Sequence, residues 1–427
     1  MALALLAATA VCFVAALQLE RLRSSGRGTR LLTAVATALV LYICYFKLRG
    51  LTGSGTSAAV PLGISYYTFR LISYVVDVHW GKIPAERDAI RFAAFVAFFP
   101  HLVAGPIQRA EEFLPQVRAD RAPWTPQLWR GITRILLGLF KKLAVADPLS
   151  LLVGYGFAQA GAGTALPSAL ALYLFPLQLY MDFAALTDIA IGVGLLFGIE
   201  SPENFDRPFM APNISEFWRR WHMSLTGWLR DYVFMPMRMA LRNWGNAGLV
   251  VSLTVNMVLI ALWHGFRTSF LVFGLIHSAY LIIDVLSSPY RKRFYRKHAI
   301  TAKAAAIAGP VLTYHLVAIA DVFFRVPTFS AGAQVLIGLG AGFGGLTEAL
   351  SVATAPPNHH AWAALPFAAL AILGDSARRR WRGSAAEIRP RWLRWSACAV
   401  IAVSCVFMVL VMVAGRQEAS PFLYENF

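Results

Sequence analysis

The chain contains few charged residues and few cysteines. Only 14% of its 427 residues are Asp, Glu, Lys or Arg, whereas 58% are hydrophobic and the mean hydropathy is +0.57. This composition excludes a disordered chain and a soluble enzyme. The 4 cysteines lie in apolar stretches with no Cys-x-x-Cys motif and no Cys/His pairing at metal-ligand spacing, at Cys12, Cys44, Cys398 and Cys405. They predict neither a disulfide framework nor a metal site.

The motifs of common soluble catalytic sites are also missing. The sequence has no Gly-x-Ser-x-Gly nucleophile elbow, no P-loop and no His-x-x-x-Asp motif. One Gly-x-Gly-x-x-Gly string, at Gly340, Gly342 and Gly345, has no strand pattern before it and no acidic residue about 20 positions after it. We therefore interpret this string as a membrane loop rather than a dinucleotide site.

Long apolar runs recur along the whole chain, and their lengths are close to the roughly 20 residues that a helix needs to cross a bilayer. The expected spans are residues 2–19, 31–46, 58–78, 90–104, 128–146, 165–181, 184–199, 247–266, 269–286, 303–324, 361–374 and 395–414. The sequence therefore predicts an all-α polytopic membrane protein with about 11 to 12 transmembrane or re-entrant helices. Because no repeat or long linker divides it, we expect a single domain over residues 1–427.

Basic residues outnumber acidic ones, 39 against 22, which gives a net charge of +17. They gather in three short loops, residues 21–30, 291–297 and 378–394. We predict that these loops are cytoplasmic and face anionic lipid headgroups rather than nucleic acid. If the loop 291–297 is cytoplasmic, the helix over 247–266 runs outward. The sequence Trp263-His264-Gly265 is then expected in the outer half of the membrane.

The segment 200–246 is expected on the cytoplasmic side as an amphipathic or re-entrant segment. Its charged side chains would each cost about 2.5 to 3.5 kcal/mol at the centre of a membrane helix, so it does not cross lipid. Large apolar side chains nevertheless repeat at helical spacing, at Trp218, Trp221, Leu225, Trp228 and Tyr232. This pattern predicts an amphipathic helix with His222 at the edge of the aromatic stripe. Asn213 followed by Glu216 predicts its capped start.

Two of the 9 histidines are candidate functional residues. His264 ends an uncharged run at membrane depth, where an ionisable side chain indicates a function. His222 is the second candidate, on the predicted amphipathic helix, with packing at the edge of the helix as the alternative. The other histidines have structural interpretations, such as an interhelical hydrogen bond for His277 and His315.

Six strings of residues carry a resemblance to a known family. They are Pro61-Leu-Gly-Ile-Ser-Tyr-Tyr-Thr-Phe69, Phe98-Phe-Pro-His-Leu-Val-Ala-Gly-Pro-Ile-Gln-Arg109, Tyr180-Met-Asp-Phe183 with Thr187-Asp188, Pro202-Glu-Asn-Phe205, Glu216-Phe-Trp-Arg-Arg-Trp-His-Met-Ser-Leu225 with Trp228-Leu-Arg-Asp-Tyr232, and Leu262-Trp-His-Gly265. Their order and spacing resemble the membrane-bound O-acyltransferase family, in particular the bacterial branch that carries out alginate O-acetylation and teichoic acid D-alanylation. The matches cover roughly half of the chain.

The resemblance implies a shell of helices around a central acyl-transfer tunnel in a multi-pass protein of the bacterial cytoplasmic membrane. A thioester donor, acyl-CoA or an acylated carrier protein, enters from the cytoplasm as co-substrate, and no bound cofactor is expected. The acceptor is a hydroxyl of an extracellular glycan or cell-envelope polymer, reached with the possible help of an extracytoplasmic esterase-like partner. The active histidine of the family corresponds to His264, and a second family histidine to His222.

These residues predict a division of roles. A neutral imidazole suits the task of taking a proton from the acceptor hydroxyl, so His264 is the expected general base. His222 is expected either to orient the donor or to polarise its carbonyl. Further candidates for the tunnel are Trp263, Asn256, Trp221 and Asp182. An interhelical hydrogen bond is an equal interpretation for Asn256. Asp182 and Asp188 are expected to pair with the Arg-rich helix, and architectural ion pairs are expected of Arg219, Arg230 and Asp231.

Two alternatives remain open. Acetylating members of the family continue after Arg-Asp-Tyr with a Gly-Gly turn, whereas this chain has Met235-Pro-Met, and its length is nearer that of the D-alanylating members. D-alanyl transfer from a carrier protein to teichoic acid is therefore an alternative to acetyl transfer. A transporter or flippase that relays protons through buried His and Asp side chains is the alternative from another class, although the two halves of the chain show no repeat symmetry.

Overall fold

The computed structural model describes residues 2–51, 63–102, 105–118, 125–161, 163–342, 345, 351, 361–362 and 364–382. In these residues the secondary structure contains helices but no strand, which confirms the all-α prediction. The chain forms two compact units, Met1–Ile135 with Thr187–Glu203, and Leu136–Leu186 with Asn204–Phe427. That the whole of 1–427 acts as a single domain stays a prediction.

The first unit is built on α1 (Ala2–Arg21), α2 (Gly26–Leu51) and α3 (Ile64–Trp80), which pack on one another, with α4 (Ala89–Ala97) and α5 (Ala110–Arg118). It also contains most of α6 (Thr125–Phe140) and the last residues of α8 (Ala165–Leu196). A β-carbon on Gly192 of α8 would lie 2.7 Å from the backbone oxygen of Gly131 in α6. The two glycines therefore let the backbones of these helices touch.

A largely buried arginine, Arg134 on α6, adds to the same contact. The Arg134 guanidinium lies 2.5 Å from Asp188 and 2.5 Å from Glu203. The expected pairing of Asp188 with the Arg-rich helix was therefore wrong, because Arg134, on α6, takes its carboxylate. An arginine between two carboxylates satisfies charges that would be costly to bury alone.

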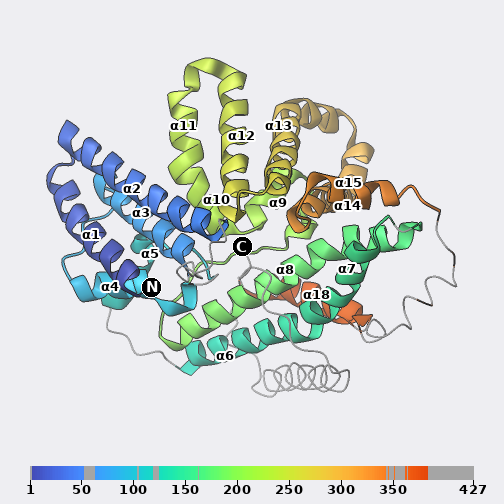
Figure 1. Cartoon of the computed structure of the whole chain (residues 1–427), viewed down its shortest axis with the longest axis horizontal. Helices are drawn as coiled ribbons and strands as arrows, with labels where there is room; N and C mark the ends of the chain where they lie inside the picture. The colour runs from blue at the N-terminus through green and yellow to red at the C-terminus, as the bar shows by residue number, and fades with distance from the viewer. Residues whose placement is uncertain are drawn as a thin grey trace. The chain divides into compact units, whose positions relative to one another are not determined.

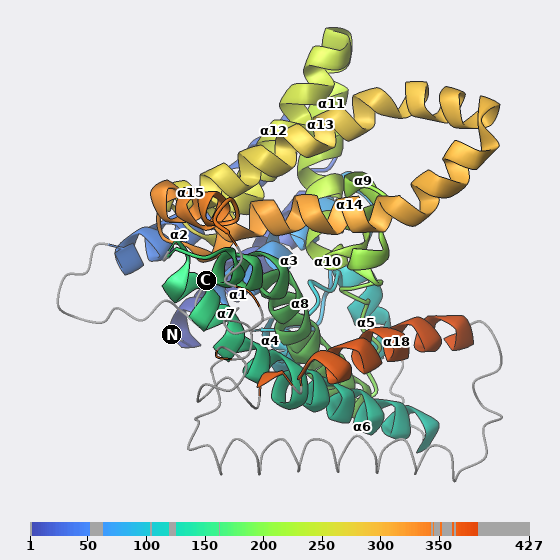
Figure 2. The same cartoon turned by 90° about the vertical axis from the view of Figure 1, so that its right-hand side faces the viewer.

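The second unit contains the three helices that follow one another as neighbours, α12 (Gly245–His264), α13 (Thr268–Lys297) and α14 (Ala299–Arg325). Figure 2 shows α13 and α14 as a long hairpin, and Figure 1 shows α12 beside α13. The other elements of this unit are a π-helical turn over Lys141–Ala146, α7 (Asp147–Gln159), the first part of α8, α9 (Ile214–Arg220), α10 (Met223–Leu229), α11 (Met235–Ala240), α15 (Phe329–Gly338) and α18 (Ala364–Arg382).

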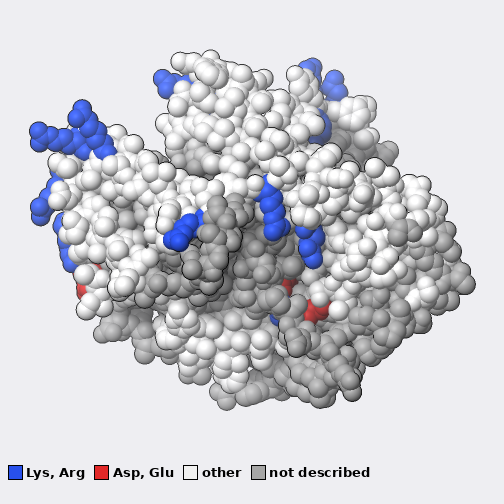
Figure 3. Space-filling model, viewed as in Figure 1, with Lys and Arg blue, Asp and Glu red and all other residues white. Residues whose placement is uncertain are grey.

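Six described helices are long and apolar enough to cross a membrane, namely Leu3–Arg21, Gly26–Arg49, Ala165–Leu196, Arg242–His264, Thr268–Lys297 and Ala299–Arg325. Large apolar side chains such as Ile283 and Val311 are exposed on them, as expected for surfaces that face lipid. On the face in Figure 3, Lys and Arg side chains stand at the far tips of α11 to α14, and a few more lie lower in the view with largely uncharged surface between them. The prediction of a polytopic membrane protein is confirmed.

Some of the predicted spans differ from the observed helices. The expected spans 165–181 and 184–199 form one helix, α8, that continues past Pro176 and Asp182 to Leu196. The expected span 90–104 contains a helix of only 9 residues, Ala89–Ala97. The expected span 395–414, the residues 52–62 and most of the basic loop 378–394 lie outside the described residues.

The charge-based topology gives a testable prediction. In a variant without the native cysteines, Arg293→Cys at the basic end of α13 should be protected from a membrane-impermeant thiol reagent in intact cells. Ser330→Cys, just beyond the other end of α14, should be labelled, because α14 has 27 residues and spans the bilayer between the two positions. Both residues are exposed, so accessibility within the protein is matched. The opposite labelling pattern would reverse the donor and acceptor sides.

Candidate active site

The amphipathic helix predicted in the segment 200–246 is interrupted at His222. Trp221 has an extended backbone (φ −101°, ψ 127°) and His222 a left-handed one (φ 43°, ψ 53°). The chain therefore leaves α9 at Arg220, restarts as α10 at Met223, and continues through a π-helical turn over Arg230–Phe234. The prediction of one continuous helix was wrong. A left-handed backbone costs a residue other than glycine about 1 to 2 kcal/mol, so its surroundings must stabilise it.

Asn204 supplies that stabilisation. Its backbone oxygen accepts a hydrogen bond from the Met223 amide at 2.8 Å, and its Oδ1 accepts one from the Ser224 hydroxyl at 2.6 Å. The same Oδ1 lies 3.2 Å from Nδ1 of His222. Asn204 has 0% of its surface exposed, so these bonds form in a dry interior, where they are strongest. The bonds fix both the turn and the orientation of the imidazole.

The hydrogen bonds also fix the tautomer of His222. The backbone N–H of Ser224 donates to Asn204 Oδ1, so this atom is the amide oxygen, which accepts and does not donate. His222 Nδ1 must therefore carry the hydrogen, and Nε2 carries the lone pair. Burial lowers the pKa of His222 to about 3, which keeps the imidazole neutral at physiological pH.

Trp263 lies between the two candidate histidines. Its ring centroid is 5.9 Å from that of His222 and 4.6 Å from that of His264. On its other side, the His222 ring meets Phe183 of α8 edge-on at 4.8 Å. Two histidines that lie 42 positions apart in the sequence are thus brought close to the same Trp263 ring.

His264 is the last residue of α12 and is 8% exposed. Its ring packs against Phe324 of α14, with centroids 4.7 Å apart, and lies 6.1 Å from that of Phe270. One turn earlier, Ala261 and the backbone of Met257 lie where a β-carbon on Gly274 would be, so α13 approaches α12 closely just below the histidine. The imidazole is held by a rigid helix packing and not by a loop.

The remaining tunnel candidates have varied surroundings. Trp221 stacks on Phe217, with centroids 5.6 Å apart, and meets Phe205 at 5.1 Å. Oδ1 of Asn256 is buried and accepts no hydrogen bond within the described part of the chain, so the interhelical bond considered for it is not formed there. The tunnel roles of these residues stay predictions.

Asp182 belongs to a buried ion cluster. Lys142, in the π-helical turn, lies 2.8 Å from Asp182 and 2.9 Å from Asp147. The expected pairing of Asp182 with the Arg-rich helix was therefore wrong, because Lys142, 40 residues earlier, provides the cation. The Lys141-Lys142 pair inside an apolar run was the signal that sequence reasoning passed over.

Arg219 and Arg230 of the segment 200–246 pair with acidic residues close in sequence. Arg219 lies 2.5 Å from Glu216, one turn earlier, and Arg230 lies 2.8 Å from Asp231. Asn213 accepts a hydrogen bond from the Glu216 amide at 2.9 Å, so the predicted capped start of the helix is confirmed. Since the Arg219 side chain is 73% exposed, its ion pair contributes at most about 1 kcal/mol to stability.

His277 forms the interhelical hydrogen bond that its position predicted. It is 1% exposed, and its Nδ1 accepts a hydrogen bond from Nε1 of Trp218 at 3.3 Å. This bond ties α9 to α13 and gives His277 a structural partner. His277 therefore has a structural role distinct from that of the rings around Trp263, although all these residues belong to one compact unit.

The chain is similar to known proteins over much of its length. The family model for membrane-bound O-acyltransferases matches residues 84–308, which include both candidate histidines. A probable alginate O-acetylase of Pseudomonas aeruginosa is 33% identical over 87% of this chain and 78% of its own length. A peptidoglycan O-acetyltransferase of Helicobacter pylori is 30% identical over 66% of this chain and 56% of its own length. A teichoic acid D-alanyltransferase of Bacillus subtilis is 31% identical over 60% of this chain and 66% of its own. With more than half of the chain matched, this integral membrane protein is an O-acyltransferase and belongs to the membrane-bound O-acyltransferase family.

Proposed function

We propose that the chain transfers an acetyl group from a cytoplasmic thioester to a hydroxyl of an extracytoplasmic polysaccharide or cell-envelope polymer, with His264 as general base. The observation that carries the proposal is the position of His264 at the end of a membrane helix. Its ring lies against Trp263 and Phe324, and His222 lies on the far side of Trp263. The protein works in the bacterial cytoplasmic membrane in this proposal, which agrees with relatives named for acetylation of alginate and of peptidoglycan.

The chemistry needs a base because a hydroxyl is a weak nucleophile. His264 takes the hydroxyl proton as the oxygen attacks the thioester carbonyl carbon. The carbon–sulfur bond then breaks, and the leaving thiolate recovers the proton from the imidazolium, so His264 returns to its neutral form. Transfer is direct, from donor to acceptor. The aromatic rings of Trp263, Phe270 and Phe324 keep water, a competing acceptor, away from the reacting atoms.

His222 positions the donor in this proposal. Its Nε2 carries the lone pair, so it accepts a hydrogen bond and cannot donate one to a thioester oxygen. A pantetheine arm offers amide N–H groups, and this arm is common to coenzyme A and to acyl carrier proteins. His222 therefore acts as a positioning residue that accepts an N–H of the arm, whichever donor is used.

Substitution of His222 tests this role. We expect His222→Ala to reduce kcat/KM about tenfold, the effect of one lost hydrogen bond, and to raise KM for the donor more than it lowers kcat. His222→Gln, which keeps an acceptor, should recover part of the loss. Arg220→Ala is the control, because the Arg220 guanidinium points to the carbonyl of Met210 at 3.2 Å. Equal effects of His222→Ala and Arg220→Ala on donor KM would contradict a positioning role.

The function itself is tested with purified protein in lipid nanodiscs. Acetyl-CoA, an acetylated carrier protein and a D-alanylated carrier protein are each supplied with oligosaccharide or glycerol phosphate acceptors, and ester formation is followed by mass spectrometry. Acetyl esters on a sugar hydroxyl support the proposal. D-alanyl esters alone would identify the alternative donor, and movement of an unmodified substrate across proteoliposomes without any ester would indicate a transporter.

A further inference from the structure

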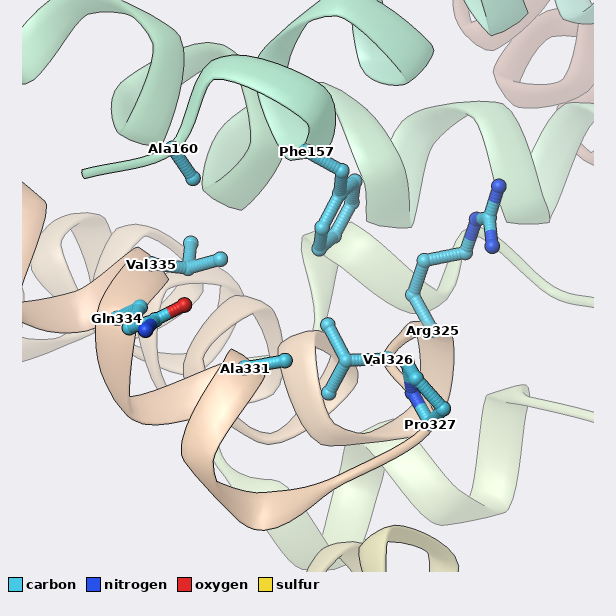
Figure 4. A pocket seen from close by; sticks show the side chains of 8 residues that line it. All are labelled: Phe157, Ala160, Arg325, Val326, Pro327, Ala331, Gln334 and Val335. Atoms are coloured by element: carbon cyan, nitrogen blue, oxygen red, sulfur yellow. The ribbon is translucent and has the colours of Figure 1, made fainter. Parts of the chain in front are cut away.

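A pocket of about 170 Å³ lies within the second compact unit. Three elements form it: the end of α7, the end of α14 with the segment that follows it, and α15. Its lining residues are Phe157, Ala160, Arg325, Val326, Pro327, Ala331, Gln334 and Val335. In Figure 4 the Phe157 ring projects from α7 into the pocket, with Arg325 on one side of it and Gln334 on the other.

Arg325 brings a positive charge to the pocket, and none of the lining residues is acidic. The Arg325 guanidinium lies over the Phe157 ring, 5.8 Å from its centroid, and the side chain is exposed. It forms no ion pair with the residues that the structure describes. An exposed guanidinium without a carboxylate partner is suited to bind an anionic oxygen group from outside the protein, and the planar fork of its N–H groups matches a phosphate.

The position of Arg325 places this charge at the edge of the membrane. Arg325 is the last residue of α14, whose 27 residues extend about 40 Å, more than the roughly 30 Å of bilayer hydrocarbon. An arginine at the end of such a helix keeps its stem in the apolar region and extends its guanidinium into the headgroup layer. The phosphate groups of phospholipids lie in that layer. With the topology predicted from charge, this is the outer leaflet.

One face of α15 lines the pocket, and another face of the same helix is apolar and exposed. Ala331 and Val335 line the pocket. Ile337 lies about 160° around the helix from Val335, at about 100° per residue, and is 75% exposed. Phe329, on the same side as Ile337, is 57% exposed. Large apolar side chains exposed at the depth of a helix end contact acyl chains, so the pocket borders lipid.

The floor of the pocket is rigid. Val335 belongs to a buried cluster that includes Leu172 of α8 and Val322 of α14, and Phe157 and Ala160 pack against this cluster. Because a shared core fixes these helices, the walls of the pocket are in place before a ligand arrives. Such preorganisation lowers the entropy cost of binding.

The volume of the pocket limits the part of a lipid that it can hold. About 170 Å³ corresponds to roughly six water molecules at about 30 Å³ each, which is room for a phosphate group and a glycerol backbone but not for acyl chains. The chains would extend past the exposed Phe329 and Ile337. Since no acidic residue lines the pocket, the amine of a zwitterionic headgroup would lack a partner there, whereas Gln334 offers a donor and an acceptor to a headgroup hydroxyl.

We propose that this pocket binds one anionic phospholipid of the surrounding membrane, a glycerophospholipid without an amine, with its phosphate on Arg325 and its glycerol backbone against Phe157 and Val326. The bound headgroup fills the space between α7, α14 and α15, so the lipid stabilises the contact of these helices by mass action. The site does not depend on the proposed acyl group or acceptor, since a protein without transferase activity would bind the same lipid.

The test counts bound lipids directly. The full-length protein in detergent is titrated with dioctanoyl phosphatidylglycerol, and the complexes are resolved by native mass spectrometry for the wild type, Arg325→Gln, Arg325→Lys and Arg293→Gln. We expect Arg325→Gln to raise the Kd of the tightest site at least about tenfold. Arg325→Lys should raise it less, because an ammonium keeps the charge but loses the fork. Arg293→Gln removes the same charge at the basic end of α13 and should leave this Kd unchanged.

A second variant blocks the pocket without changing its charge. Ala331→Leu adds apolar volume to the face of α15 that lines the pocket and should also raise the Kd at least about tenfold. The size-exclusion profile of each variant shows whether it is folded. Binding at the wild-type Kd by folded Arg325→Gln or by folded Ala331→Leu would overturn the site.

Three further ligands identify the class of molecule that is bound. Dioctanoyl phosphatidylethanolamine keeps the phosphate and the chains but adds an amine, and it should bind the wild-type protein more weakly than the phosphatidylglycerol. Equal binding of the two lipids would overturn the preference for an anionic headgroup. Inorganic phosphate and a glycerol phosphate oligomer supply a phosphate without acyl chains. If either occupied the Arg325-dependent site as tightly as the lipid, the assignment to a membrane lipid would be refuted.

Discussion

The variant His264→Ala should lose acyl transfer almost completely while the protein remains folded. Without a base, the hydroxyl must attack with its proton in place, and the loss of general base catalysis lowers a rate by about 10² to 10⁴. The measurement is ester formation per minute by purified protein at saturating donor and acceptor. Since His264 lies at the end of α12 and is packed by rings on two sides, removal of its imidazole leaves the helix contacts below it in place.

A second histidine provides the matched control. His315 lies on α14, in the same compact unit, and its Nδ1 is 2.8 Å from the hydroxyl of Tyr173. His315→Ala removes an imidazole and one hydrogen bond from a membrane helix but nothing from the proposed site, and it should retain most of the activity. Turnover at the wild-type rate by a folded His264→Ala protein would show that another group is the base.

Replacing Lys142 should have the largest effect on stability. Lys142 is 6% exposed and lies between Asp147 and Asp182, so Lys142→Met leaves two carboxylates buried without their shared cation. Breaking a buried pair from one side costs about 3 to 5 kcal/mol. We expect a large fall in the temperature at which the detergent-solubilised protein aggregates. Size-exclusion chromatography after heating measures this temperature.

Arg130→Met is a control that removes a cation from an exposed ion pair. Arg130 lies 2.8 Å from Glu200, and the two side chains are 56% and 57% exposed, so its loss should cost about 1 kcal/mol or less. Adding Asp182→Leu to Lys142→Met removes one of the stranded carboxylates and should restore part of the stability. A Lys142→Met protein as stable as Arg130→Met would mean that water reaches the two carboxylates despite their burial.

Interactions between residues close in sequence were the ones that sequence reasoning predicted well. Asn213 caps the helix that contains Glu216 because the two are three positions apart, and the apolar runs give the long helices of the membrane. The turn at His222 could not be predicted in this way. The aromatic spacing around it is helical, and the bonds that hold its left-handed backbone come from Asn204, 18 residues earlier.

The same reasoning explains the errors in charge pairing and in the length of α8. Asp182 lies in an apolar run without a basic residue, and its partner is Lys142 on another element and not the Arg-rich helix. Once Lys142 neutralises it, the carboxylate no longer interrupts the helix, and α8 continues where two separate spans were expected. The pocket at Arg325 was likewise hidden, because its lining comes from three elements whose packing no local pattern encodes.

The length of α8 also bears on the lipids that surround the protein. Its 32 residues extend about 48 Å at 1.5 Å per residue, whereas the hydrocarbon of a typical bilayer is about 30 Å thick. Spanning that thickness by tilt alone would need about 50°, beyond the roughly 40° at which membrane helices reach their limit. Part of α8 must therefore protrude from the hydrocarbon or be shielded by neighbouring helices, and most of its apolar stretch is buried inside the protein. Because these neighbours rather than lipid surround α8, we expect the acyl-chain length of the lipid to affect its stability little.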